Sequence, residues 1–279
     1  MATQDYRRES LEAWDKVSAG WERERRRIWD MTRAVGEWLV DALDPQPGET
    51  IVELAAGLGD TGFAAAARLG DEGRLITSDF APGMLEAARR RAAELEVTNA
   101  EFRPLDAERL ELDDRSVDGV ICRLGYMLMS DPVTAFRETR RVLRDRGRVV
   151  FAVWADPERN PWATVAGRAF REHTGEPPPD PDDPGAFALA REERIREVLR
   201  AARLEPQRIE ELDMRWRFES LDDYWRWMLE TSPLGSQVHE LPEEGQSAVR
   251  EGMARGLEPF AAADGSYDVR GACLNVLAS

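Results

Sequence analysis

The residues with the clearest chemical meaning are three glycines that follow an apolar stretch. Gly57, Gly59 and Gly62, in the string VELAAGLGDTGFAAA, form the pattern G-x-G-x-x-G. Such a loop joins a strand to a helix, so that backbone N–H groups and the positive end of the helix dipole face a ligand. Asp79, about 20 residues further on, could accept hydrogen bonds from ribose hydroxyls. The pattern and this acid indicate a nucleotide-type cofactor without deciding which one.

Two further carboxylates count against a nicotinamide or flavin cofactor. Glu53 lies inside the strand that precedes the loop, where a dinucleotide-binding strand is usually apolar. A buried carboxylate is costly without a partner, and a cationic ligand group such as an α-ammonium would supply one. Asp106 follows the third expected strand, where it could accept from an adenine amino group while the N–H of Ala107 donates to a ring nitrogen.

Alternating strands and helices predict the sheet that positions these residues. Apolar residues recur at helical spacing before Asp44, which predicts N-terminal helices, and DPQPGE then breaks the pattern. The expected strands are 50–55, 74–79, 100–104, 116–123 and 148–154, and the expected helices between them are 61–69, 82–95 and 132–143. This alternation is typical of a parallel sheet with helices on both faces.

The pattern changes after Trp154. A Pro- and Asp-rich loop is expected over 174–185, helices over 191–203, 221–231 and 243–257, and strands over 207–218 and 270–279. We therefore predict cap helices over 1–46, a Rossmann-like core over 47–155, and over 156–279 the last strands with helical lid insertions at about 156–204 and 219–266.

The composition narrows the classes of partner. The 279 residues carry 38 basic and 54 acidic side chains, a net charge of −16, which would repel the phosphate backbone of a nucleic acid. The basic run Arg23–Arg27 fits a solvated helix face. No apolar run approaches the roughly 20 residues of a membrane span, and no signal peptide is evident, so we expect a cytoplasmic protein. Cys122 and Cys273 are expected to be buried free thiols, and no metal cluster is indicated.

The order of the motifs resembles the class I S-adenosylmethionine-dependent methyltransferases. VELAAGLGD matches the family's first motif, SDFAPGMLEAAR its second-strand motif and DAERL its adenine-contact motif, all within Thr50–Trp154. The form Gly57-Leu58-Gly59-Asp60 looks most like the branch of the ubiquinone/menaquinone C-methyltransferases. Ala55 stands where relatives often have glycine, and LRDRGR stands where they often have Pro-Gly-Gly. The resemblance implies an α/β, Rossmann-like, doubly wound, seven-stranded and mostly parallel sheet with an antiparallel last strand and a helical cap.

The resemblance also implies a site for S-adenosylmethionine, with S-adenosylhomocysteine as product and no metal. The residues that it implies for this site are Glu53, Ala55, Ala56, Gly57, Gly59, Asp79, Phe80, Met84, Asp106, Ala107, Arg123 and Leu124. For Phe80, Met84 and Leu124 the alternative is plain core packing. For Asp79 and Asp106 it is a helix cap or a turn.

Methyl transfer from a sulfonium needs alignment and exclusion of water more than acid–base chemistry. The candidates for catalysis are Tyr126 and His173, but the sequence identifies no general base. Four aromatic residues are expected to line an acceptor site, although helical spacing also fits ordinary packing: Trp21, Tyr126, Trp162 and Trp225.

The sequence thus predicts O- or C-methylation of a small, hydrophobic or aromatic metabolite, with a homodimer left open. One alternative is an NAD(P)-dependent oxidoreductase, although Lys16 is the sole lysine and no Tyr-x-x-x-Lys pair occurs. Another is a non-catalytic S-adenosylmethionine-binding protein.

Overall fold

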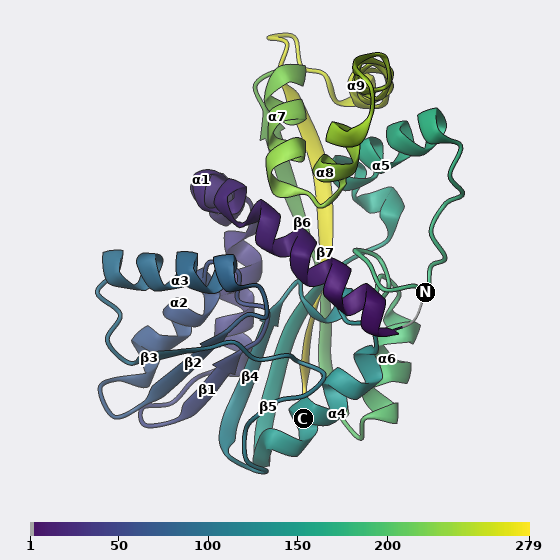
Figure 1. Cartoon of the computed structure of the whole chain (residues 1–279). Helices are drawn as coiled ribbons and strands as arrows, with labels where there is room; N and C mark the ends of the chain where they lie inside the picture. The colour runs from purple at the N-terminus through teal and green to yellow at the C-terminus, as the bar shows by residue number, and fades with distance from the viewer. Residues whose placement is uncertain (1–2) are drawn as a thin grey trace.

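The computed structural model describes residues 3–279, with side chains from Asp5 onward (Figure 1). Its centre is a seven-stranded sheet in the order β3-β2-β1-β4-β5-β7-β6. The strands are β1 (Thr50–Glu53), β2 (Arg74–Ser78), β3 (Ala100–Arg103), β4 (Val117–Arg123), β5 (Leu143–Trp154), β6 (Pro206–Phe218) and β7 (Tyr267–Ala278). Strands β1 to β5 pair in parallel, and β7 is antiparallel to both β5 and β6. The predicted fold class is therefore confirmed.

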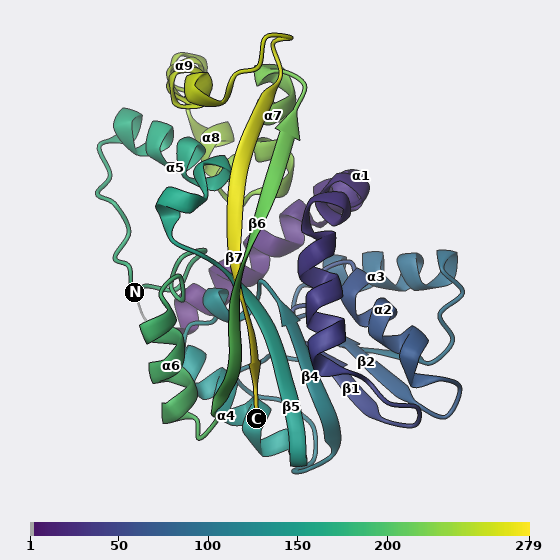
Figure 2. The same ribbon diagram turned by 180° about the vertical axis from the view of Figure 1, so that it is seen from behind.

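The described helices are α1 (Thr3–Leu43), α2 (Asp60–Leu69), α3 (Pro82–Glu94), α4 (Pro132–Val142), α5 (Pro161–Thr174), α6 (Glu192–Ala201), α7 (Leu221–Thr231), α8 (Leu234–Glu240) and α9 (Glu243–Leu257). Helices α1 to α3 pack together on one face of the sheet, and α4 and α6 pack together on the other (Figures 1 and 2). Among the described helices, none combines the length and the apolar character needed to cross a membrane.

Strands β6 and β7 extend beyond the other strands, and α5, α7, α8 and α9 gather beside that extension (Figure 2). Within the segment 156–204, α5 belongs to this upper group, whereas α6 lies beside α4 on the sheet. The Pro- and Asp-rich segment after α5 forms no helix or strand up to residue 185, since proline removes backbone donors and fixes φ. The division into core and lid segments stays a prediction.

The helices differ from the sequence expectation in three places, one of which is the short helix α8, between the expected helices 221–231 and 243–257. Residues 3–43 form one continuous helix, where several had been expected. Helix α5 was not expected, although Trp162, Val165, Ala166, Ala169 and Phe170 recur at helical spacing on its buried side.

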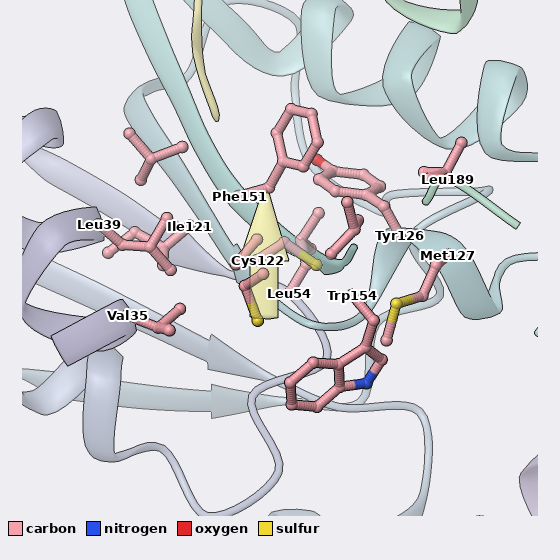
Figure 3. Packing of buried hydrophobic residues seen from close by; sticks show 14 of the residues in the cluster. Val35, Leu39, Leu54, Ile121, Cys122, Tyr126, Met127, Phe151, Trp154 and Leu189 are labelled. Atoms are coloured by element: carbon pink, nitrogen blue, oxygen red, sulfur yellow. The ribbon is translucent and has the colours of Figure 1, made fainter. Parts of the chain in front are cut away.

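The core is continuous from the sheet into the upper group of helices. Figure 3 shows Val35 and Leu39 of α1 beside Ile121 of β4, and Phe151 of β5 next to Tyr126. Because β4 and β5 are covered on both faces, residues 119–122 of β4 and 149–154 of β5 are buried, as expected of central parallel strands. This rigid centre fixes the loops at the carboxyl ends of the strands.

Candidate functional site

A pocket lies at the carboxyl ends of β1, β2 and β4, where the strand order reverses between β1 and β4. Open α/β sheets bind ligands at such a switch point. The pocket encloses about 930 Å³ of space outside the atoms, its open mouth included. It is lined by Tyr6, Arg7, Ser10, Trp14, Trp21, Ala55, Ala56, Gly57, Asp79, Phe80, Met84, Leu105, Asp106, Ala107, Glu108, Arg123, Leu124, Gly125, Leu128, Met129 and Ser130.

Each glycine of the G-x-G-x-x-G pattern has its own structural reason. Gly57 has φ +56° and Gly59 has φ +81°, conformations that favour glycine. A Cβ on Gly59 would also lie 2.5 Å from the ring of Phe63. At Gly62, in the first turn of α2, a Cβ would lie 2.2 Å from Oε2 of Glu53. The third glycine therefore allows α2 to pack against the carboxylate of β1.

Two residues that line the pocket hold left-handed backbone without being glycine. Ala55, after β1, has φ +48°, and Leu124, after β4, has φ +63°. These two loops pack closely, since a Cβ on Gly125 would lie 2.6 Å from the Cβ of Ala55. The family's frequent glycine at position 55 is thus replaced by a residue in a glycine-like conformation, a kind of strain that is common at functional sites.

Asp79 is 6% exposed and joins the loops after β1 and β2. Its Oδ2 accepts from the N–H of Gly57 at 2.9 Å, and its Oδ1 accepts from the N–H of Ala81 at 2.9 Å. Burial raises the pKa of this carboxyl to about 6, although the backbone donors act in the opposite direction. A carboxylate oxygen has two lone pairs, so each oxygen can accept one more hydrogen bond. Asp79 can therefore also receive ligand hydroxyls, which fits a ribose.

Glu53 lies below the glycine loop rather than on the pocket surface. Its Oε1 accepts from the N–H of Gly62 at 2.8 Å, and its Oε2 is buried without a partner in the described chain. Burial raises the pKa of this carboxyl to about 8, against the opposing effects of the Gly62 N–H and of Arg123. Glu53 and Gly59 are the two residues expected at the cofactor that do not line the pocket. Both lie at the packing of β1 and the loop against α2.

The side of the pocket near Asp106 is closed by the first turns of α1. Asp106 turns the chain by accepting from the N–H of Glu108 at 2.9 Å. Arg7 forms an ion pair with Asp106 and lies 3.7 Å from Glu108. Glu108 also accepts from the N–H and the hydroxyl of Ser130, each at 2.8 Å. The sequence reasoning missed Arg7, because nothing local connects α1 to this loop. It also missed Glu108 and Ser130, which come from the loops after β3 and β4.

The opposite wall is aromatic. Trp14 and Trp21 of α1 meet edge to face, with ring centroids 5.7 Å apart. The indole N–H of Trp21 donates to the carbonyl of Thr231 in α7 at 2.8 Å, and its ring faces Gly57. The hydroxyl of Tyr6 donates to the carbonyl of Leu128 at 3.0 Å. Helix α1 thus covers the pocket with apolar surface, as ligand sites commonly require.

Arg123, at the end of β4, is the other cation of the pocket. Its Nε donates to the hydroxyl of Thr61 at 2.9 Å, and its Nη1 donates to the hydroxyl of Thr32 at 2.8 Å. Helices α1 and α2 therefore hold the guanidinium in place. Burial lowers the pKa of Arg123, while Glu53 and Asp60 act in the opposite direction.

Four residues expected at the acceptor site or in catalysis lie outside the pocket. Tyr126 is fully buried, stacked on Phe136, with its hydroxyl 2.6 Å from that of Thr139. It turns away because Leu124 adopts φ +63° and a 3-10 turn follows. Burial raises the pKa of Tyr126 well above its usual value.

The other three also have structural surroundings. Trp162 stacks on Trp216, with ring centroids 4.3 Å apart, in an aromatic cluster between β5, β6 and α7. Trp225 is half-buried on α7 and packs against the same core. His173 is exposed near the end of α5, next to Gly245. Of the four tryptophan and tyrosine residues proposed for the acceptor site, Trp21 is the one found in the pocket.

The arrangement suits binding and alignment. The pocket of the described chain contains three carboxylates, two guanidinium groups and a wall of aromatic and aliphatic side chains, but no histidine. In residues 3–279 no group of three or more His, Cys, Asp or Glu side chains could hold a metal ion.

Comparisons with known proteins agree on the class of domain. Residues 51–147 match the family model described as a methyltransferase domain. Aklanonic acid methyltransferase DauC of Streptomyces sp. is 30% identical over 151 residues, which are 54% of this chain and 67% of that protein. A demethylmenaquinone methyltransferase of Beutenbergia cavernae is 37% identical over 125 residues, 44% of this chain. The alignment spans less than half, 47%, of that relative's length.

Solved structures share the fold over most of the chain. A Bacillus halodurans protein assigned as a methyltransferase gives a TM-score of 0.60 at 18% identity, covering 87% of this chain and 97% of that one. The [4+2]-cyclase SpnF gives a TM-score of 0.54 at 17% identity, covering 88% of this chain and 79% of that one. At these identities the likeness shows the fold alone, and one fold can host different reactions.

Proposed function

Because this chain belongs to the class I S-adenosylmethionine-dependent methyltransferases, close to the branch of the ubiquinone/menaquinone C-methyltransferases, we propose that it methylates a carbon or oxygen atom of a small hydrophobic or aromatic metabolite. The observation that supports this proposal most is one pocket that joins the Gly57–Asp79 pair to the indoles of α1. The net charge of −16 argues for a small-molecule acceptor over a nucleic acid.

The pocket residues fit the proposed cofactor. Asp79 has free lone pairs for the ribose hydroxyls, and the backbone of Ala55, Ala56 and Gly57 is exposed to the pocket. In the proposal Phe80 and Met84 pack beside the adenine, Asp106 and Ala107 meet its edge, and Arg123 and Leu124 border the methionine part. The bound cofactor supplies a sulfonium-activated methyl group.

The contribution of the protein is then to align an acceptor and to exclude water. Trp14 and Trp21 close the pocket from α1, and the bond from Trp21 to Thr231 ties that wall to α7. Their aromatic faces favour a flat, apolar acceptor. The proposal assigns no general base, because Asp79, Asp106 and Glu108 are each already engaged by backbone donors, serine or arginine.

Calorimetric titration with S-adenosylmethionine, S-adenosylhomocysteine and NADH in parallel tests the cofactor. We expect binding of the two sulfur compounds, lost in Asp79→Ala and retained in Asp213→Ala, a control on the exposed part of β6. Aromatic acceptors are then incubated with the protein and the cofactor, and mass spectrometry detects products heavier by one methylene. Binding of NADH alone would support the oxidoreductase. Tight binding of the sulfur compounds without product would support a non-catalytic binding protein.

A further inference from the structure

Arg123 is a half-buried cation without an ion-pair partner in the described chain. No carboxylate among residues 3–279 lies within 4.0 Å of its nitrogens, and its described hydrogen bonds go to two neutral hydroxyls. Burying a charge is costly unless an opposite charge compensates it. Burial lowers the pKa of Arg123, and the carboxyl of Glu53 opposes this by electrostatic attraction, but it does so without forming an ion pair with it.

Other arginines of similar burial show the contrast. The side chains of Arg27 and Arg91 are each 24% exposed, and each has a carboxylate oxygen at 3.0 Å. The side chain of Arg148 is 29% exposed and has a carboxylate oxygen at 3.1 Å. Arg7, the second cation of the pocket, is paired with Asp106. Arg123 alone among these five lacks such a partner.

The hydrogen bonds show which donors of Arg123 are free. A guanidinium has five N–H donors in one plane. Thr61 receives the Nε donor and Thr32 receives one Nη1 donor. One Nη1 donor and both Nη2 donors remain, and Nη2 has no partner in the described chain. These three donors lie on the two terminal nitrogens of the fork, which suits the oxygens of a carboxylate.

The position of the fork favours an anion as well. Arg123 lines the pocket, and its partner Thr61 lies in the first turn of α2, where the helix dipole is positive. Asp79, the pocket carboxylate after β2, accepts from the N–H groups of Gly57 and Ala81 and forms no ion pair with Arg123 in the described chain.

We propose that Arg123 is a carboxylate anchor, which binds the acid group of a small molecule in this pocket through its free Nη1 and Nη2 donors. Two sources share this chemistry: the amino-acid part of the cofactor, and an acidic acceptor. The inference rests on the proposed function, since both are ligands of the pocket that the function requires. Thr32 and Thr61 act as positioning residues that fix the plane of the guanidinium.

The test compares ligands with and without a carboxylate. S-adenosylhomocysteine is titrated against 5′-deoxy-5′-methylthioadenosine, which keeps the adenosine and the thioether but lacks the amino-acid group. On protein loaded with S-adenosylhomocysteine, 4-hydroxybenzoate is titrated against its methyl ester. The variants are Arg123→Met, Arg123→Lys, which keeps the charge without the fork, and Arg148→Met, which removes an equally buried arginine whose partner is Glu49 at the other end of the sheet. Circular dichroism checks folding, and Arg123→Lys carries the test if Arg123→Met does not fold.

We expect Arg123→Met to weaken one carboxylate ligand by about 10- to 100-fold and to leave its uncharged counterpart unchanged. A loss confined to S-adenosylhomocysteine identifies the cofactor as the source, and a loss confined to 4-hydroxybenzoate identifies the acceptor. Arg148→Met should change neither series. Equal affinities of the wild type and the Arg123 variants in both series would overturn the proposal. If the wild type binds neither adenosyl compound, the proposed function itself fails.

Discussion

The contact between Gly62 and Glu53 predicts that Gly62→Ala destabilises the protein, although replacing glycine by alanine in a helix is commonly stabilising. Gly→Ala inside a helix usually stabilises by about 1 kcal/mol, because alanine loses less backbone entropy. In Gly62→Ala the new methyl carbon would lie 2.2 Å from Oε2 and 2.7 Å from Cδ of Glu53, well inside contact distance. Leu75 behind it, at 3.2 Å, leaves little room for the helix to shift.

The expected loss of stability follows from displacing the buried carboxylate of Glu53. Overpacking costs about 1–3 kcal/mol, and displacing Glu53 also breaks its 2.8 Å bond from the N–H of Gly62, which costs about 1–3 kcal/mol more. After the helix-propensity gain of about 1 kcal/mol, we expect Gly62→Ala to lower the free energy of unfolding by about 1–5 kcal/mol. For a chain of this size that corresponds to a Tm lower by about 2–20 °C.

Thermal and urea unfolding followed by circular dichroism measure this change. Gly167→Ala is the matched control, because it also lies inside a helix but its nearest atom is the flexible end of Arg171 at 3.1 Å. That variant should be stabilised by up to about 1 kcal/mol. Glu53→Ala makes room for the methyl, so the double variant should be more stable than additivity predicts, by about 1–3 kcal/mol. A Gly62→Ala protein at least as stable as the wild type would refute the packing of Glu53 against α2.

Three other expectations follow from the pocket and its surroundings. Because burial raises the pKa of Asp79 to about 6, protonation below that pH should weaken binding of S-adenosylhomocysteine in the wild type, whereas Asp79→Asn should bind weakly across the same range; calorimetry at about pH 7 and about pH 5 checks this. The same raised pKa means that this carboxyl contributes less stability as the pH rises from about 4 to about 6. Trp21→Ala should weaken the same ligand by about tenfold or more, and Trp225→Ala, outside the pocket, should not, as parallel titrations would show. Cys122, whose pKa burial raises to about 12, and Cys273 should resist iodoacetamide until the protein unfolds, which mass spectrometry can follow.

The sequence predicted helices and strands best where the hydrophobic period and the residues that begin or end an element agreed. Helices α7 and α9 occupy the expected residues, because Ser220 caps the first and Pro242 precedes the second. The strand β7 was expected from its alternation, and β6 pairs with it along its whole length. Helix α5 had an equally clear period, so its signal was present and overlooked.

The pocket was predictable only where its residues follow the strands. The loops after β1, β2 and β4 contain ten of the residues found in it, because parallel strands bring their carboxyl ends together. Arg7 reaches it through the path of α1, which local sequence does not specify. Tyr126 was misplaced because the chain does not continue as a strand after β4: Leu124 has φ +63°, a 3-10 turn begins at Tyr126, and the tyrosine hydroxyl meets that of Thr139 in the core.

The two ends of the described chain differ in how suitable they are for attaching a tag or a label. Tyr6 and Arg7 already form part of the pocket wall, only a few residues into α1. Ala278 instead pairs with Val149 in the middle of β5. The C-terminus lies on the side of the sheet opposite the extension of β6 and β7 (Figure 1). An affinity tag, a fluorophore or a surface linker placed near Tyr6 would therefore report on, or obstruct, the mouth of the pocket. The same group placed after Ala278 would leave that mouth open, so immobilised binding measurements on this protein should be anchored at the β7 end.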